Sequence, residues 1–160
     1  MDVSIVIVNY NTFEDTCNCI HSIYEKTKDI EFEIIVVDNQ SSSFNPQEFK
    51  NLFPNINLII SAENGGFAKG NNQGIEIAKG KYVLLLNPDT ILNNNAIYYL
   101  WKEMEMDSTI GISTCHLEYG DGKIQYTARK FRTISWELLQ LSQFYRFLPK
   151  EKRENTMLHH

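Results

Sequence analysis

The stretch Tyr82-Val83-Leu84-Leu85-Leu86-Asn87-Pro88-Asp89-Thr90 joins a continuous apolar run to a sharp polar turn. A run without polar alternation predicts a strand covered on both faces, as in a buried parallel sheet. The turn places the carboxylate of Asp89 at the carboxyl end of that strand, where open α/β sheets bind ligands. One acid in a Pro-stiffened turn suits a divalent cation held against a phosphate, although Asn87-Pro88-Asp89 is also ordinary turn chemistry.

Composition and charge restrict the class of protein. The chain has 160 residues, 42% of them hydrophobic and 22% charged, which suits one globular domain with a core of its own. The net charge of -5 argues against a nucleic-acid partner, because an acidic chain gathers phosphates only through a strong basic patch. Basic residues crowd the C-terminal portion, where they form either a solvated helix face or a contact for anionic lipid or phosphate.

The three cysteines, Cys17, Cys19 and Cys115, have no metal-ligand spacing, and their odd number argues against a disulfide framework. We interpret them as reduced, small hydrophobic residues of a cytoplasmic protein. Neither a signal peptide nor a membrane-spanning run is visible in the sequence.

Strand and helix signals alternate along the chain. Strands are expected over 3–8, 33–37, 56–60, 82–86 and 110–115. Helices are expected after Thr12, after Asn45, from the Gly-rich segment to about Lys79, and over 97–104; a hairpin is expected around Gly120-Asp121-Gly122. This order predicts an α/β fold with three layers, α/β/α, around a mainly parallel sheet.

The first helix has its own start signal and apolar stripe. Thr12 is the expected N-cap, with Asp15 in the reciprocal capping position. The expected buried stripe consists of Phe13, Cys17, Ile20 and Tyr24.

Polar clusters follow three of the expected strands: Asn9-Tyr10-Asn11, Asp38-Asn39 and Asn87-Pro88-Asp89. Right-handed crossovers bring such strand ends to one edge of the sheet. There Tyr10 can stack on a base, and Asp38 can accept hydrogen bonds from a base N–H or a ribose hydroxyl. Asp89 then remains for a diphosphate through a cation, so the clusters predict a nucleotide-type ligand.

The Gly-rich segment 64–72 matches neither the dinucleotide fingerprint nor a phosphate-binding loop. Its glycines let the backbone pass close to another group, and they open a helix whose N-terminus favours an anion. Asn71 and Asn72 add neutral donors. A flexible helix entry is an equally good interpretation of these residues alone.

Taken together, these motifs resemble the family 2 glycosyltransferases of the GT-A fold, and within them the bacterial rhamnosyltransferase-like branch. The matching segments, in the right order over most of 3–133, are 3–11, 37–41, 64–74 and 86–89, and less specifically 120–125 with 129–133.

The resemblance implies a dTDP-, UDP- or GDP-linked sugar donor, with Mg²⁺ or Mn²⁺ held by Asp89 on the diphosphate. Tyr10 would lie against the base, and Asp38 would bond the base or ribose. The other implied nucleotide-binding residues are Asn9, Asn11, Asn39, Gly66, Phe67, Asn71 and Asn87. Asn87 stands where the commonest form of the family's Asp-x-Asp motif has its first aspartate.

The resemblance also implies inverting transfer to a polysaccharide or lipid-linked acceptor, with a downstream Asp or Glu as the base. After residue 127 only Glu137, Glu151 and Glu154 remain, and none has the surroundings of that motif, so we expect the base outside this chain. We therefore expect a nucleotide-sugar-binding domain over 1–130, followed over 131–160 by an apolar helix and charged tail that begin a truncated acceptor-side region.

Alternatives remain open at this point. The chain could be a donor-binding module without turnover, or a nucleotidyltransferase, although Asn9-Tyr10-Asn11-Thr12 stands where the latter has its phosphate loop. The apolar stripe within 134–148 could contact the missing half, a second copy of the chain in a homodimer, or a membrane surface. We expect a cytoplasmic protein, with peripheral attachment to the inner face of the cell membrane as an option.

Overall fold

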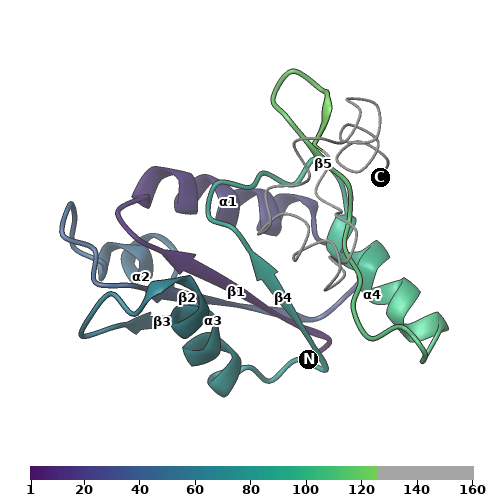
Figure 1. Ribbon diagram of the computed structural model, residues 1–160, viewed down its shortest axis with the longest axis horizontal. Coiled ribbons are helices and arrows are strands. Elements are labelled where there is room, and N and C mark those ends of the chain that lie inside the picture. Colours follow the sequence, from purple (N-terminus) through teal and green to yellow (C-terminus); the bar gives the residue numbers. More distant parts are fainter. Residues whose placement is uncertain (126–160) are drawn as a thin grey trace, which may run out of the picture. The chain divides into compact units, whose positions relative to one another are not determined.

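Four parallel strands form the central sheet (Figure 1). The computed structural model describes residues 1–125, and the sheet lies in the first of two compact units, Met1–Ser113. The strands are β1 (Val3–Asn9), β2 (Phe32–Asp38), β3 (Asn57–Ile60) and β4 (Tyr82–Leu86), in the spatial order β3-β2-β1-β4. The register pairs Asn9 with Asp38 and Ile7 with Leu86, so the strands end together at one edge.

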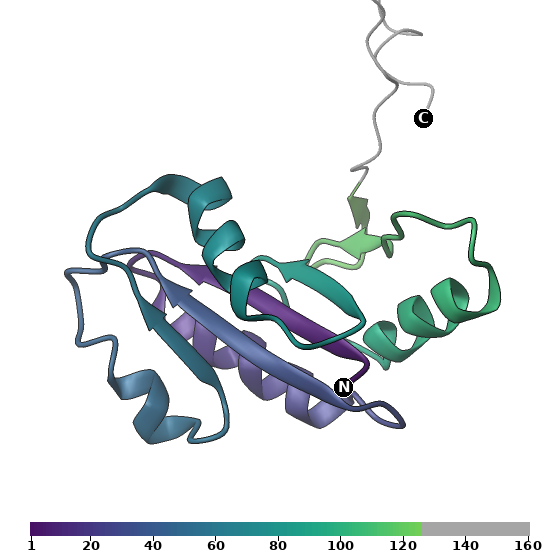
Figure 2. The same ribbon diagram turned by 90° about the horizontal axis from the view of Figure 1, so that it is seen from below.

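Helices cover both faces of this sheet, which confirms the predicted three-layer α/β/α architecture. Figure 2 shows α1 (Phe13–Lys26) on one face and α3 (Gly66–Ile77) on the other. The short α2 (Glu48–Leu52) and the longer α4 (Ala96–Met106) complete the first unit. None of the helices in the described part of the chain is both long and apolar enough to cross a membrane.

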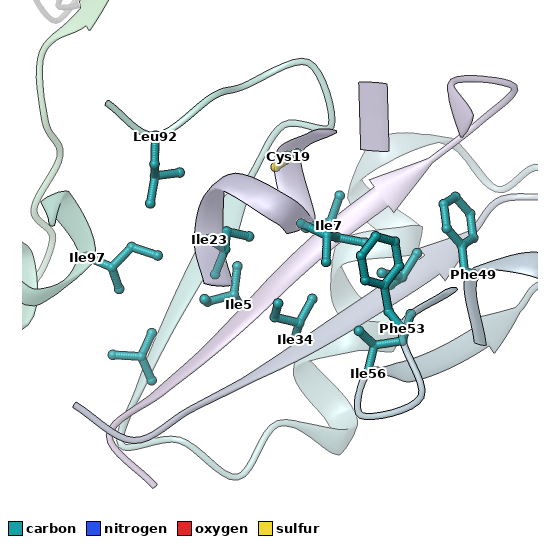
Figure 3. Close-up of a cluster of buried hydrophobic side chains, with 13 residues drawn as sticks. Ile5, Ile7, Cys19, Ile23, Ile34, Phe49, Phe53, Ile56, Leu92 and Ile97 are labelled. Carbon is teal, nitrogen blue, oxygen red and sulfur yellow. The ribbon is translucent and has the colours of Figure 1, made fainter. Parts of the chain in front are cut away.

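The core follows from the central position of β1, all seven residues of which are buried. Ile5 and Ile7 point toward α1 and pack with Ile23, Ile34 and Phe49 (Figure 3). The alternate residues of the strand form a second cluster on the α3 face, which consists of Val6, Val8, Ile35 and Val37.

Two glycines allow α3 to lie directly on β1. A Cβ on Gly70 would come within 2.8 Å of Val8 Cγ1, and one on Gly74 within 2.4 Å of Val6 Cγ1. Both distances are far shorter than a carbon–carbon contact. The group that these glycines approach is therefore the protein's own central strand.

The prediction of a doubly covered strand over 82–86 is wrong on one face. Leu84 and Leu86 pack against the α1-side core, but Val83 and Leu85 are 40% and 47% exposed. Within the described residues β4 is the last strand of the sheet, and α3 packs on β1 and β2 instead.

The predicted strand over 110–115 is also wrong. These residues belong to no sheet of the described chain, and Ile112 is 92% exposed. The second unit begins at Thr114, and its predicted hairpin is confirmed as β5 (Leu117–Glu118) and β6 (Ile124–Gln125), paired antiparallel. Gly122 has φ +80° in the turn, a backbone conformation that glycine adopts readily. The helix predicted within 134–148 lies outside the described residues.

The first helix begins after Thr12 as predicted, but its buried stripe is shifted. Tyr24 is 38% exposed, and Phe13 and Cys17 are only partly buried. The buried residues are Thr16, Cys19, Ile20, Ser22 and Ile23.

Candidate functional site

The loops that follow the four parallel strands meet at the carboxyl edge of the sheet. The predicted residues lie in or beside these loops, so the prediction that distant strand ends share one edge is confirmed. β1 lies between β2 and β4, which places Tyr10 after the central strand, Asp38 at the end of one neighbour and Asp89 beyond the other.

Asn9 and Asp38 form a fully buried pair at the centre of this edge. Asn9 Nδ2 donates to Asp38 Oδ2 at 2.6 Å, and the Ser41 N–H donates to Asp38 Oδ1 at 2.9 Å. Both side chains have 0% exposure. Hydrogen bonds from such donors offset the cost of burying a carboxylate without a cation beside it.

Asn9 also holds Thr12, the N-cap residue of α1, through its side-chain oxygen. The Thr12 side chain makes no capping bond to the helix; its hydroxyl and its N–H instead donate to Asn9 Oδ1 at 2.9 and 3.3 Å. The buried Thr16 hydroxyl lies 3.0 Å from the same oxygen. Thr12 is therefore the N-cap residue as predicted, but the predicted side-chain cap is wrong, because its hydroxyl donates to Asn9 and not to the helix.

Asn11 connects the first strand-end loop to the second. Its φ of 57° turns the backbone, and its Oδ1 accepts the N–H groups of Ser42 and Ser43 at 2.9 and 3.1 Å. The Asn11 N–H in turn donates to Ser41 Oγ at 2.9 Å.

Asn39 connects the second loop to the start of α3. It is 3% exposed; its Nδ2 donates to Asn64 Oδ1 at 2.8 Å and its Oδ1 accepts the Gly65 N–H at 3.2 Å. Gly66 follows with φ +80°, and the Phe67 side chain is 55% exposed. Asn71, at 4% exposure, donates to the Phe67 carbonyl at 3.1 Å.

The turn after β4 presents its polar side chains to solvent. Asn87 and Asp89 are both exposed, and the Thr90 N–H closes the turn on the Asn87 carbonyl at 3.2 Å. The Cys19 thiol of α1 lies 3.7 Å from that carbonyl. Burial, with a smaller contribution from the charge of Asp89, raises the pKa of Cys19 from 9.0 to about 12.

The predicted residues thus divide into two groups. We call Asn9, Asp38, Asn39 and Asn71 the frame, because they are buried and bonded to protein. We call the exposed side chains the rim, which consists of Tyr10, Asn11, Phe67, Asn87 and Asp89.

Sequence reasoning missed Ser41, Thr16 and Asn64, which complete the network around the frame. A signal existed for Ser41: an Asp followed by a serine a few residues on is typical of a turn in which the carboxylate caps the backbone.

The rim fits a cation that arrives with its ligand. In residues 1–125 no group of three or more His, Cys, Asp or Glu side chains could hold a metal ion. Magnesium is commonly held by one or two carboxylates together with water and substrate phosphates. Asp89 alone therefore suits a shared cation and not a site built from protein ligands only.

Comparison with known proteins identifies the family of the chain. The sequence profile of the family described as "Glycosyl transferase family 2" matches residues 4–159. The chain belongs to this family. Two relatives of the family 2 chain are a poly(ribitol-phosphate) beta-glucosyltransferase of Bacillus spizizenii, 33% identical over 69% of the chain, and the glycosyltransferase GlyG of Streptococcus pneumoniae, 31% identical over 78%. The family 2 chain spans only 19% and 42% of their lengths.

Solved structures agree on the fold. The TarS 1-349 structure of S. aureus in complex with UDP-GlcNAc superposes with a TM-score of 0.58 at 24% identity, covering 66% of the family 2 chain and 32% of TarS. The architecture of the family 2 chain is the GT-A type, with a mostly parallel central sheet between flanking helices.

Proposed function

We propose that the family 2 chain binds a nucleotide-diphosphate sugar across the carboxyl edge of its sheet. One observation carries the proposal: the strand order sets the buried carboxylate of Asp38 and the exposed carboxylate of Asp89 on opposite sides of the central strand, which Tyr10 follows. Neighbouring strands lie about 4.8 Å apart, so the two outer strand ends are about 10 Å apart. That span accommodates a nucleoside laid along the edge, with its diphosphate toward Asp89.

Each group in this arrangement has a distinct task. The ring of Tyr10, 49% exposed, offers a stacking surface for the base. Asp38 accepts hydrogen bonds from a base N–H or a ribose hydroxyl, while Phe67 and Asn87 line the same edge. Asp89 would hold Mg²⁺ or Mn²⁺, which when bound offsets the charge of the leaving diphosphate.

We propose further that the whole protein transfers the sugar with inversion to a polysaccharide or lipid-linked acceptor, within the rhamnosyltransferase-like branch. TarS has been solved with UDP and with UDP-GlcNAc, which supports a UDP-linked donor ahead of a dTDP- or GDP-linked one. Relatives named for poly(ribitol-phosphate) and poly-beta-1,6-N-acetyl-D-glucosamine support a polymeric acceptor. In this proposal residues 1–130 bind the donor, and residues 131–160 begin the acceptor side. Any contact with a membrane or with a second copy of the chain is made through residues 134–148. The protein would act at the inner face of the cell membrane.

Calorimetry tests donor binding. The chain is titrated with UDP-, dTDP- and GDP-sugars, with and without Mn²⁺, beside the variants Asp89→Ala and Glu76→Ala. Glu76 is a matched control, because it is an exposed carboxylate near the end of α3, away from the carboxyl edge. We expect Mn²⁺-dependent binding that Asp89→Ala removes and Glu76→Ala leaves intact. Absence of heat with every donor, or equal binding by both variants, contradicts the proposal.

A donor-binding module without turnover is the second candidate. It is favoured by the sequence after residue 127, where the only acids are Glu137, Glu151 and Glu154 and none has the surroundings expected of the catalytic base. Incubation of the chain with the bound donor and an acceptor polymer separates the two: sugar transfer excludes the module, while binding without transfer supports it.

A further inference from the structure

The amide of Asn9 has no polar capacity left for a ligand. Its Nδ2 donates to Asp38 Oδ2 at 2.6 Å and to Ser41 Oγ at 3.0 Å. Its Oδ1 faces the Thr12 hydroxyl, the Thr12 N–H and the Thr16 hydroxyl at 2.9, 3.3 and 3.0 Å. An amide has two N–H donors and one oxygen with two lone pairs, so this amide is fully occupied.

We propose that Asn9 is a positioning residue, which recognises the nucleotide through Asp38 and does not touch it. This inference rests on the proposed function, since it explains how the carboxylate that meets the donor is aimed. Each Asp38 oxygen accepts one protein hydrogen bond, from Asn9 and from the Ser41 N–H, and a carboxylate has about four lone-pair sites in total. The remaining sites are thereby fixed in direction before any ligand arrives.

The groups that bond the Asp38 carboxylate carry no charge. Within residues 1–125 the groups that bond the Asp38 side chain are the uncharged Asn9 and Ser41, and no ion pair of the described chain includes Asp38. A lysine or arginine in place of Asn9 would neutralise the carboxylate and compete with a base N–H for it. The amide orients the buried carboxylate without neutralising its charge.

The opposite edge of the sheet contains a matched pair for comparison. Asn57 Nδ2 donates to the buried Glu33 Oε2 at 2.8 Å, the same amide-to-carboxylate bond at the starts of β3 and β2. Ser4 Oγ and the Lys79 N–H donate to the other Glu33 oxygen, each at 2.7 Å. This pair connects strands, as the pair at Asn9 does, but it lies far from the proposed site.

The decisive variants are therefore Asn9→Asp and Asn57→Asp. Each sets a second carboxyl group against a buried carboxylate, and two carboxylates at that distance cannot both be ionised, so one keeps a proton at low pH. In Asn9→Asp that proton restores a hydrogen bond to Asp38, whereas at high pH repulsion turns Asp38 away. Titration of UDP, dTDP and GDP with Mn²⁺ at pH 5.5 and pH 8 measures the consequence.

We expect Asn9→Asp to bind the preferred nucleotide about tenfold more weakly at pH 8 than at pH 5.5, the equivalent of one pKa unit of coupling. The unchanged chain and Asn57→Asp should show the same pH dependence as each other, set by ionisation of the terminal phosphate of the nucleotide, and the tenfold effect is measured relative to that dependence. Equal binding by Asn9→Asp and the unchanged chain at both pH values overturns the inference. The same pH dependence in Asn57→Asp also overturns it, because a general loss of stability then explains the effect.

A second pair of variants decides the matter if Asn9→Asp does not fold. Thr16→Val removes a fully buried hydroxyl that lies 3.0 Å from Asn9 Oδ1 and 2.8 Å from the Thr12 carbonyl oxygen, whereas Thr16→Ser keeps both contacts. Weaker nucleotide binding by Thr16→Val, rescued by Thr16→Ser, supports the inference, and equal binding by the two overturns it. If the unchanged chain binds none of the nucleotides, the proposed function itself fails; if it binds and the variants follow it, only the positioning role fails.

Discussion

Gly74→Ala tests the close contact between α3 and the central strand. A Cβ at this position would lie 2.4 Å from Val6 Cγ1 and 3.1 Å from Val6 Cγ2. An ordinary contact needs about 3.5 Å, so helix and strand must separate by about 1 Å. Val6 is 0% exposed and β-branched, so its side chain has no open space into which it can rotate.

Two opposing effects set the magnitude. Overpacking a core typically costs about 1–3 kcal/mol, whereas replacing glycine by alanine inside a helix gains about 1 kcal/mol. We expect the free energy of unfolding to fall by about 1–2 kcal/mol in Gly74→Ala. The fall should be smaller in Gly70→Ala, whose added Cβ would lie 2.8 Å from Val8 Cγ1.

Urea unfolding followed by circular dichroism measures both variants, and the Val6→Ala background supplies the control. Once the Val6 methyl groups are gone, the nearest contact of the new Cβ is Val37 Cγ2 at 3.4 Å, which is ordinary. Gly74→Ala should then stabilise the chain by about 1 kcal/mol through helix propensity. A stabilising effect in the native background, or the same loss in both backgrounds, refutes the close packing of α3 on β1.

Three further results are expected. Iodoacetamide at pH 8 should modify the exposed Cys115 and spare the buried Cys19 until the chain is unfolded, as peptide mass spectrometry will show. Burial raises the pKa of Cys19 from 9.0 to about 12, so the contribution of this thiol to stability is complete below pH 9.0 and is lost as the pH rises toward about 12. Cys19→Ala should therefore flatten the alkaline decline in the free energy of unfolding. Ser4→Ala removes the hydroxyl that donates to Glu33 at 2.7 Å and accepts the Gly80 N–H at 2.8 Å, and should lower the free energy of unfolding by about 1–3 kcal/mol in urea titrations.

The sequence predicted the mainly parallel sheet and the meeting of the strand ends because both depend on local patterns and on general rules of handedness. Continuous apolar runs located the four parallel strands to within a residue or two. Parallel pairing then required Asn9 and Asp38 to lie at one edge, as the register confirms.

The sequence could not show how these side chains use their hydrogen bonds. Asn9 and Asp38 are 29 positions apart, and only the register reveals that they bond each other. The prediction that β4 is covered on both faces failed for a similar reason, because an apolar run does not show which neighbour covers each face. The segment 110–115 has strand-like residues, yet pairing requires a partner strand, and it has none within the described residues.

Amide NMR of the chain with UDP and Mg²⁺ tests the central claim most directly. The carboxyl-edge account predicts shifts concentrated at residues 9–11, 38–41, 64–67 and 87–89, with the opposite edge around Ser4, Glu33 and Asn57 unchanged. Replacing Mg²⁺ by Mn²⁺ should broaden the resonances nearest Asp89 most strongly. Shifts centred on the opposite edge, or broadening that avoids 87–89, would contradict a nucleotide-diphosphate site at the carboxyl ends of these strands.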